Sequence, residues 1–344
     1  MTMPAAHPVD ACQILPLHPR WQESARQIYD QAFSQADLPY GQQLPSHYLA
    51  NRLFGSSLWP SDSSRILLTQ AGEGVGLALA NRRLNPATPE GEWLWVQLFC
   101  IVPAWQRRGL GRLLLHHLLE EAAATGKRGL STALQWAGLW PGIPASLQAM
   151  QHFCQHTGAC WRPGEIYLEM DIREEPSVPA VNPSWRDGAT LSAYAPHHQP
   201  GLTALLRDHF SIGWQHEVLH RIDPAYEPFN GYGWAGPPAF HPPGQAIMVL
   251  EYQEEVVGFA LLQGDTHPST AFFGPIGLHP EWRGHGWGSR LLRAAAQRLR
   301  AQGGRRLGLW TSAALATGFY APLGLLPRTT TRHAQWQLPP RQGG

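Results

Sequence analysis

Two stretches of the chain decide the fold. Residues 103–111 read PAWQRRGLG and residues 280–288 read PEWRGHGWG, so the same order of proline, tryptophan and glycines occurs twice. A second pair of similar segments, VGLA from residue 75 and VGFA from residue 257, lies upstream in the same order. Because both copies keep this order, we interpret the chain as two copies of one domain rather than as a solenoid of short repeats.

Each copy is expected to place a β-hairpin, an apolar strand, a glycine turn, a helix and a short strand in that order. The helices begin at the glycine turns, and their leucine or alanine spacing stops near Gly126 and Gly303. The expected strands are 66–70, 75–80, 92–102 and 130–134 in the first copy, and 246–252, 256–263, 270–279 and 307–311 in the second. Alternating strands and helices predict an α/β (α+β layered) fold, with a central mixed β-sheet flanked by helices in each of two tandem domains.

The strand at 270–279 differs from its counterpart because Gly274, Pro275 and Gly277 interrupt it. Such residues weaken a regular ladder, so a bulge or a close backbone approach is expected there.

The boundary between the copies is predicted from composition. Residues 174–188 read EEPSVPAVNPSWRDG, which is rich in proline and poor in large apolar residues, as is typical of an extended linker. We therefore predict an N-terminal domain at 1–173, a linker at 174–185 and a C-terminal domain at 186–344.

Composition excludes several classes of protein. The chain has 344 residues, of which 43% are hydrophobic and 15% charged, too apolar and too weakly charged for a disordered chain. Its formal net charge of +1 gives no global field that would attract nucleic acid or an anionic membrane, so neither is an expected partner. The sequence contains neither a long apolar run nor a signal-peptide pattern, and its four cysteines make no disulfide framework. A cytoplasmic location is therefore expected.

The glycine turns have the chemistry of a phosphate site. The first N–H groups of a helix have no intrahelical partner and the helix dipole is positive there, while glycine lets a phosphate approach the backbone. Gly109, Gly111, Gly286 and Gly288 are placed for this role, and arginines precede them. A P-loop is excluded because the chain has no Gly-Lys-Ser/Thr, and a dinucleotide fold is excluded because no third glycine follows at the required spacing.

These turns resemble motif A of the GNAT superfamily of acetyl-CoA-dependent N-acetyltransferases, whose signature is [RQ]-x-x-G-x-[GA]. The segments QRRGLG at 106–111 and RGHGWG at 283–288 both match it. The resemblance implies that turn amides bind the pyrophosphate of coenzyme A and that the preceding strand pairs with pantetheine. The implied acetyl-CoA-binding residues are Ile101, Val102, Gln106, Arg107, Arg108, Gly109, Leu110, Gly111 and Arg112 in the first copy, and Leu278, His279, Arg283, Gly284, His285, Gly286, Trp287, Gly288 and Ser289 in the second.

The family also has a tyrosine after the following strand, which can protonate the departing thiolate. Tyr320, within FYAPLGL, matches that tyrosine, whereas Cys154 stands at the aligned position of the first copy. A core-packing tyrosine is the plain alternative for Tyr320. Because tandem members of the family such as mycothiol synthase are similar in arrangement, the C-terminal domain is favoured as the active one. The N-terminal domain would then either bind the cofactor without catalysing or act without a tyrosine.

The general base is less well marked. The strand positions where many family members carry a glutamate are Trp95 and Phe272, which do not titrate. His279 has a suitable unperturbed pKa, although an ordinary surface histidine is the simpler interpretation. Glu92, Glu251, Asp265 and a water relay are weaker alternatives.

Two further features were weighed. His152, Cys154, His156 and Cys160 lie close in sequence, but their spacing fits no familiar zinc signature, so no metal is expected. Residues 227–244, rich in aromatics, glycine and proline, are either an acceptor-binding loop or a loop packed on itself.

The resemblance therefore implies transfer of an acetyl group from acetyl-CoA to a primary amine of a small molecule or peptide. A non-catalytic acyl-CoA sensor and an acyltransferase with another acyl-CoA donor remain alternatives.

Overall fold

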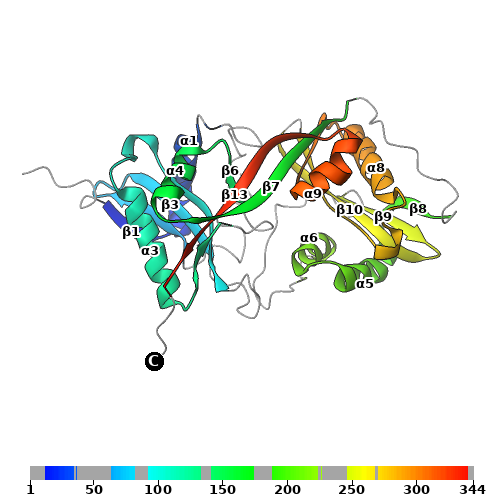
Figure 1. Ribbon diagram of the computed structural model, residues 1–344, viewed down its shortest axis with the longest axis horizontal. Coiled ribbons are helices and arrows are strands. Elements are labelled where there is room, and N and C mark those ends of the chain that lie inside the picture. Colours follow the sequence, from blue (N-terminus) through cyan, green and yellow to red (C-terminus); the bar gives the residue numbers. More distant parts are fainter. Residues whose placement is uncertain are drawn as a thin grey trace, which may run out of the picture. The chain divides into compact units, whose positions relative to one another are not determined.

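A computed structural model describes residues 12–34, 36, 63–81, 92–132, 141–173, 188–223, 226, 246–267 and 270–339, with the backbone alone for 263–272 (Figure 1). The predicted linker at 174–185 and the predicted acceptor loop at 227–244 lie outside these residues. The described part of the chain forms two compact units. The N-terminal unit holds the residues up to Glu165 and from Thr330 onward, and the C-terminal unit holds those from Ile166 to Thr329.

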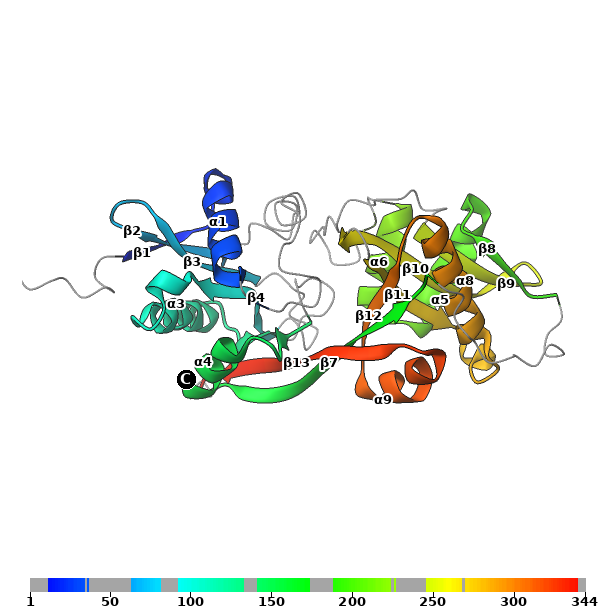
Figure 2. The same ribbon diagram turned by 90° about the horizontal axis from the view of Figure 1, so that it is seen from above.

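The N-terminal unit is built on a mixed sheet with strand order β1-β2-β3-β4-β5-β13, in which only β4 and β5 are recorded as parallel neighbours. Its elements are β1 (Cys12–Pro16), α1 (Gln22–Phe33), β2 (Arg65–Thr69), β3 (Gly74–Asn81), β4 (Leu94–Ile101), α3 (Leu110–Ala124), β5 (Gly129–Ser131), β6 (Ile143–Pro144) and α4 (Gln148–His156). Figure 2 shows α1 and α3 on opposite sides of this sheet.

The C-terminal unit repeats the arrangement with strand order β7-β12-β11-β10-β9-β8, where β11 and β12 are the parallel pair. Its elements are β7 (Cys160–Asp171), β8 (Thr190–Ala193), α5 (Gln199–His209), α6 (Ile212–Ile222), β9 (Ile247–Tyr252), β10 (Glu255–His267), β11 (Thr270–Leu278), α8 (Trp287–Ala301), β12 (Arg306–Thr311), α9 (Ala313–Leu315) and β13 (Leu326–Gln337). The predicted fold class is thus confirmed, and the expected hairpins, strands and helices appear at their predicted places.

Alternation along β9 shows how helices cover both faces of the sheet in the C-terminal unit. Ile247 and Val249 belong to the core that contains α5 and α6, whereas Met248 and Leu250 belong to the core under α8. Because successive strand residues point to opposite faces, α5 and α6 lie on one face and α8 lies on the other.

The predicted bulge in the second copy is confirmed. The pairing of β10 with β11 shifts register between Ala260↔Ile276 and Leu262↔Phe273, so Gly274 and Pro275 on β11 stand opposite the single residue Leu261 on β10. The first copy has a shift of the same size, where Leu79↔Leu98 is followed by Ala80↔Val96 and Gln97 is the extra residue on β4.

Two long strands, β7 and β13, each begin in one compact unit and end in the other, which their positions in the chain do not suggest. β7 begins in the N-terminal unit and ends in the C-terminal unit, where its residues Ile166–Asp171 pair with β12. β13 runs the other way, and its last residues pair with β5 through Gln335↔Ser131 and Trp336↔Leu130. The domain bounds predicted from the repeat remain a prediction, because each compact unit uses a strand encoded next to the other copy.

A helix that crosses a membrane must be both long and apolar. None of the described helices combines enough length with enough apolar character to cross a bilayer.

Candidate functional site

In the N-terminal unit, side-chain and backbone geometry fix the glycine turn between β4 and α3. The Gln106 side chain donates from Nε2 to the carbonyl oxygen of Ile101 at 2.8 Å, which ties the turn to the end of the strand. Gly109 caps α3 with a φ of 85°, in the left-handed region where glycine is favoured. The first turn of α3 has no acidic residue, so its N–H groups and positive dipole remain available to an anion.

The C-terminal unit repeats this geometry. Arg283 Nε donates to the carbonyl oxygen of Leu278 at 3.1 Å, and Gly286 caps α8 with a φ of 79°. Backbone bonds also match, since Val102 N–H donates to Val75 at 3.0 Å and His279 N–H donates to Val257 at 2.8 Å. The two turns are therefore equivalent in structure as well as in sequence.

One position inside the turn differs between the copies. Arg107 has a φ of 61°, and the aligned residue of the C-terminal unit is Gly284 with a φ of 78°. A non-glycine residue in this conformation costs about 1–2 kcal/mol. The N-terminal unit thus keeps a cation beside its turn at the expense of backbone strain, as expected where an anion is to be bound.

The strands beside the turns separate. β4 pairs with β5 only at Leu94↔Leu130 and Trp95↔Ser131, and β11 pairs with β12 only from Thr270 to Phe272 among the residues described. Past these points no strand among the described residues is recorded as pairing with that edge of β4 or of β11. A ligand with amide groups can hydrogen-bond to such an edge.

A cleft in the N-terminal unit joins these features. It has a volume of about 720 Å³ and runs from Phe99–Ile101 on β4 to the turn, where Arg107, Gly109 and Arg112 line it. Glycine is favoured at position 111 in the wall, because a Cβ there would lie 3.1 Å from the Phe153 ring, a tight contact. The apolar end of the strand suits an acyl thioester, and the open backbone edge suits a pantetheine arm. The cationic glycine turn suits a pyrophosphate. The residues present therefore fit coenzyme A.

Tyr320 and Cys154 hold matching positions in the two units. The Phe319 ring lies against Gly288 as the Phe153 ring lies against Gly111, each at 3.1 Å from an added Cβ, and Tyr320 and Cys154 directly follow. The Tyr320 side chain is 6% exposed, at the end of a π-helical turn over Ala316–Tyr320. The Cys154 side chain is fully buried, and this burial raises the pKa of its thiol to about 12.

The predicted base, His279, caps the turn that follows β11. Its Nδ1 accepts the N–H of Glu281 at 3.4 Å, and its ring meets the His209 ring edge to face at 4.6 Å. In the neutral ring this bond leaves the proton on Nε2, so accepting another proton requires release of the long Glu281 bond.

The alternative carboxylate bases lie elsewhere or are engaged. Glu92 pairs with Arg128 at 2.6 Å. Glu251 pairs with His198 at 3.3 Å. The side chain of Asp265 lies outside the described part of the structure.

The remaining predicted residues are distributed along the two turns. Arg108, Arg283, Gly284 and His285 are exposed, whereas Leu110, Trp287 and Gly288 are buried and anchor the helix starts, with Ser289 half-buried. Arg108 and Arg290 stack over the Trp105 and Trp287 rings at 4.8 and 4.6 Å.

One group of side chains in the described residues brings three metal-ligand types together, namely His197, His198 and Glu251. His198 Nδ1 accepts the N–H of Ala195 at 2.9 Å, so its Nε2 carries the proton that faces Glu251. A protonated nitrogen cannot ligate a metal, and the geometry is that of a structural hydrogen bond. His152, Cys154, His156 and Cys160 form no such group among the described residues.

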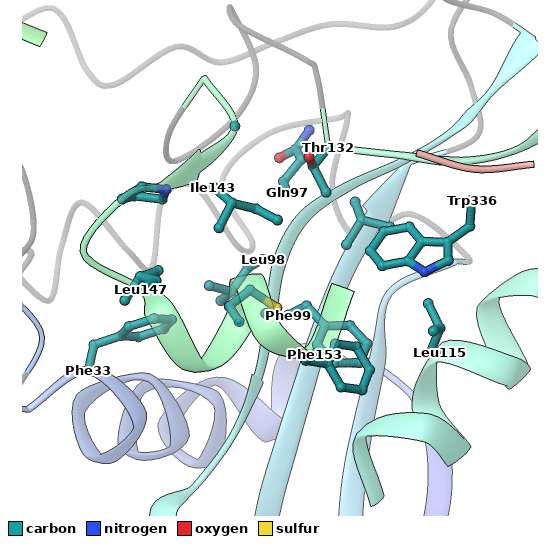
Figure 3. Close-up of a pocket in the computed structure, with 14 residues that line it drawn as sticks. Phe33, Gln97, Leu98, Phe99, Leu115, Thr132, Ile143, Leu147, Phe153 and Trp336 are labelled. Carbon is teal, nitrogen blue, oxygen red and sulfur yellow. The ribbon is translucent and has the colours of Figure 1, made fainter. Parts of the chain in front are cut away.

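Sequence reasoning missed Gln97, a residue of β4 whose side-chain nitrogen is buried with no hydrogen-bond partner in the described structure. It lines a second, smaller cavity that adjoins the cleft (Figure 3). The only sequence signal for this residue is that glutamine is the one polar residue in the otherwise apolar run LWVQLFCI.

Known proteins support the same assignment. The sequence model of the acetyltransferase (GNAT) family matches residues 23–139 and 201–325. No curated protein sequence matches the chain significantly. Among solved structures, a tandem GNAT protein from the clavulanic acid biosynthesis pathway, solved without AcCoA, is 18% identical with a TM-score of 0.67, covering 96% of this chain and 100% of that one.

Two further structures share the fold. A GCN5-related N-acetyltransferase from Sphaerobacter thermophilus is 14% identical with a TM-score of 0.67, covering 96% of this chain and 97% of its own. A GCN5-related glucosamine N-acetyltransferase region of a fungal multi-domain GH3 β-N-acetylglucosaminidase is 16% identical with a TM-score of 0.72. This chain is covered to 94% in that match and spans 38% of the fungal protein.

The matched segments fall in both copies of the repeat, and each copy carries the turn, the separated strands and the helix described above. The chain therefore belongs to the acetyltransferase (GNAT) family, as a tandem-domain member.

Proposed function

We propose that the protein is an N-acetyltransferase that transfers the acetyl group of acetyl-CoA to a primary amine, and that the C-terminal unit performs the transfer. The observation that carries this proposal is the pair of equivalent glycine turns, because the C-terminal unit has a phenol, that of Tyr320, at the position where the N-terminal unit has Cys154. In the N-terminal unit the matching Cys154 thiol has a pKa of about 12 and is fully buried.

The chemistry follows from the residues in place. The neutral amine nitrogen forms a bond to the thioester carbonyl carbon, and the carbon–sulfur bond breaks. Backbone N–H groups on the open edge of β11 stabilise the oxygen that gains charge. Tyr320 gives its phenolic proton to the departing thiolate, and the amine proton leaves to His279 or through water.

The N-terminal unit has a different role in this proposal. Its cleft has the cationic turn, through Arg107 and Arg112, and the open strand edge, but no phenol at the position of Cys154. We assign it acyl-CoA binding without transfer.

The acceptor is proposed to be a small molecule or peptide with a primary amine. Because one structurally similar protein is named a glucosamine N-acetyltransferase region, an amino sugar belongs among the first acceptors to try. All four cysteines are free thiols, which supports a cytoplasmic location.

Replacing Tyr320 by Phe tests the proposal. We expect the rate of coenzyme A thiol release with acetyl-CoA and a panel of amines, including glucosamine, aromatic amines and peptides, to fall by roughly 100-fold or more. The dissociation constant of acetyl-CoA should change little, because the phenol ring is retained. Cys154→Ala is the matched control in the other unit and should leave the rate unchanged.

Two results would count against the proposal. Full activity of the Tyr320→Phe variant would remove Tyr320 from the reaction. Binding of acyl-CoA with no transfer to any amine would favour the alternative of a sensor or scaffold.

A further inference from the structure

A second cavity adjoins the cleft of the N-terminal unit, beside the part of β4 that follows its last recorded pairing with β5. It has a volume of about 50 Å³, several times the 10–15 Å³ or so that one water requires. The cleft and the cavity share Phe33, Phe99, Leu147, Met150 and Phe153 as wall residues, so the two adjoin along that wall. The cavity therefore offers room beyond an acetyl methyl to a group that passes this shared wall from the strand end of the cleft.

The wall of this cavity is mostly apolar. The rings of Phe99 and Phe153 stack at 5.4 Å at the mouth, and Ile143, Leu115 and Trp336 line the far part (Figure 3). The Trp336 indole N–H donates outside the cavity, to Thr157 Oγ1 at 3.1 Å, so the ring itself adds no free donor. No charged side chain is among the described residues that line the cavity, which disfavours a carboxylate there.

Two polar side chains, those of Thr132 and Gln97, are among the described residues that line the cavity. Thr132 has a hydrogen-bond partner, whereas the Gln97 side-chain nitrogen has none in the described structure. Thr132 Oγ1 accepts the N–H of Ala334 at 2.9 Å. The Gln97 side-chain nitrogen is buried and has no partner among the described residues. A buried amide without a partner is costly, and a ligand oxygen placed beside it would remove that cost.

The position of Gln97 explains why its side chain is available. Gln97 is the extra residue of the β4 bulge between Leu79↔Leu98 and Ala80↔Val96. It lines the cavity but not the cleft, so it lies beyond the Phe99–Phe153 mouth. An oxygen that reaches Gln97 must stand further along the acyl chain than the thioester carbonyl.

We propose that the N-terminal unit selects a short acyl-CoA whose chain is longer than acetyl and carries a neutral oxygen beyond the thioester, such as a 3-oxo- or 3-hydroxyacyl group. The chain lies in the cavity, and the Gln97 amide donates to the distal oxygen. This inference rests on the acyl-CoA binding proposed for the N-terminal unit, but not on transfer by the C-terminal unit.

The test is calorimetric titration of the full-length Gly286→Asp variant, in which the carboxylate blocks the turn of the C-terminal unit. The ligands are acetyl-CoA, butyryl-CoA and acetoacetyl-CoA, which differ in chain length and in the distal oxygen. We expect acetoacetyl-CoA to bind roughly five- to tenfold more tightly than butyryl-CoA, the factor that one hydrogen bond supplies, and butyryl-CoA more tightly than acetyl-CoA.

Gln97→Met, added to the same background, keeps the side-chain length and removes the donor. It should abolish the preference for acetoacetyl-CoA over butyryl-CoA and leave the acetyl-CoA affinity unchanged, which also serves as its folding control. Ile143→Phe fills the far part of the cavity and should weaken both longer ligands but not acetyl-CoA.

Equal affinity for all three ligands would overturn the inference while leaving acyl-CoA binding by the unit intact. An acetoacetyl-CoA preference that survives Gln97→Met would also overturn it. Failure of every acyl-CoA to bind would overturn both this inference and the binding role of the N-terminal unit. None of these three results bears on the transfer activity proposed for Tyr320 in the C-terminal unit.

Discussion

Two buried thiols in the N-terminal unit show how strongly single residues depend on their surroundings. Cys100 on β4 and Cys154 on α4 are buried, and burial raises the pKa of each thiol to about 12. At neutral pH both are protonated and unreactive, which is why Cys154 cannot take the place of the aligned phenol as a proton donor of matched pKa.

The same shifts predict a pH dependence of stability. Between the unfolded pKa near 9 and the folded pKa near 12, the folded chain keeps two protons that the unfolded chain loses. Stability is therefore fully present below about pH 9 and is lost as pH rises, with a slope of about 1.4 kcal/mol per pH unit for each thiol. Denaturant unfolding from pH 8 to 10.5 measures this slope.

Cys154→Ala should lower the slope by about 1.4 kcal/mol per pH unit, whatever the cavity costs in absolute stability. Cys160→Ala is the matched control, because Cys160 is exposed, and should leave the slope unchanged. A wild-type slope that Cys154→Ala does not alter would contradict the burial argument.

At the scale of elements, an ion pair fixes the helix that carries the glycine turn. Arg65 on β2 bonds Glu121 on α3 at 2.6 Å, with 12% and 11% of the side chains exposed, and Arg65 Nε donates to His117 Nε2 at 2.9 Å. Because α3 begins at Gly109, this contact also helps to hold the turn against the sheet.

Glu121→Ala should destabilise the N-terminal unit by about 3 kcal/mol, because it leaves a nearly buried guanidinium without its carboxylate. Glu120→Ala on the same helix is the matched control. Glu120 is 64% exposed beside His116, and its loss should cost less than about 0.5 kcal/mol. Chemical denaturation of both variants measures the difference, and equal costs would refute the assignment.

The helices and strands were predicted more completely from the sequence than the side-chain surroundings or the pairing of strands between the two units. The apolar runs and the glycine stops predicted the strands, α3 and α8, because these signals are local. Gln97 was missed because only a three-dimensional neighbourhood shows that its amide is buried without a partner. The exchange of β7 and β13 was missed because a strand's own sequence does not state which sheet it joins.

At the scale of the whole molecule, the exchanged strands make each unit depend on residues far away in the sequence. In the C-terminal unit, Glu169 of β7 accepts from Tyr167 at 3.2 Å and from Arg328 of β13 at 3.1 Å. In the N-terminal unit, Thr331 Oγ1 of β13 donates to Pro141 at 2.8 Å and accepts from Glu165 N–H at 2.9 Å. These bonds help to fix both strands within their sheets.

Deleting residues 330–344 should therefore destabilise the N-terminal unit, although that unit's other strands lie before residue 166. The loss of Trp336 and of the ladder to β5 should cost about 4 kcal/mol or more and lower its melting temperature by roughly 10 °C. Hydrogen exchange should show faster exchange in β3 and β5, with α5 and α6 much less affected. Truncation after Pro339 is the control, and an unchanged melting temperature in the longer deletion would disprove the exchange.

We propose that both glycine turns bind acyl-CoA through its phosphate groups, and calorimetric titration of acetyl-CoA counts the sites that are occupied. Gly109→Asp and Gly286→Asp each place a carboxylate at one turn, while Gly109→Asn and Gly286→Asn place a neutral side chain of the same shape that tolerates the left-handed backbone. We predict two acetyl-CoA sites in the wild type, loss of one site in each Asp variant, and retention of both sites in the Asn variants. Absence of binding in the wild type, or two sites that survive both Asp substitutions, would contradict it.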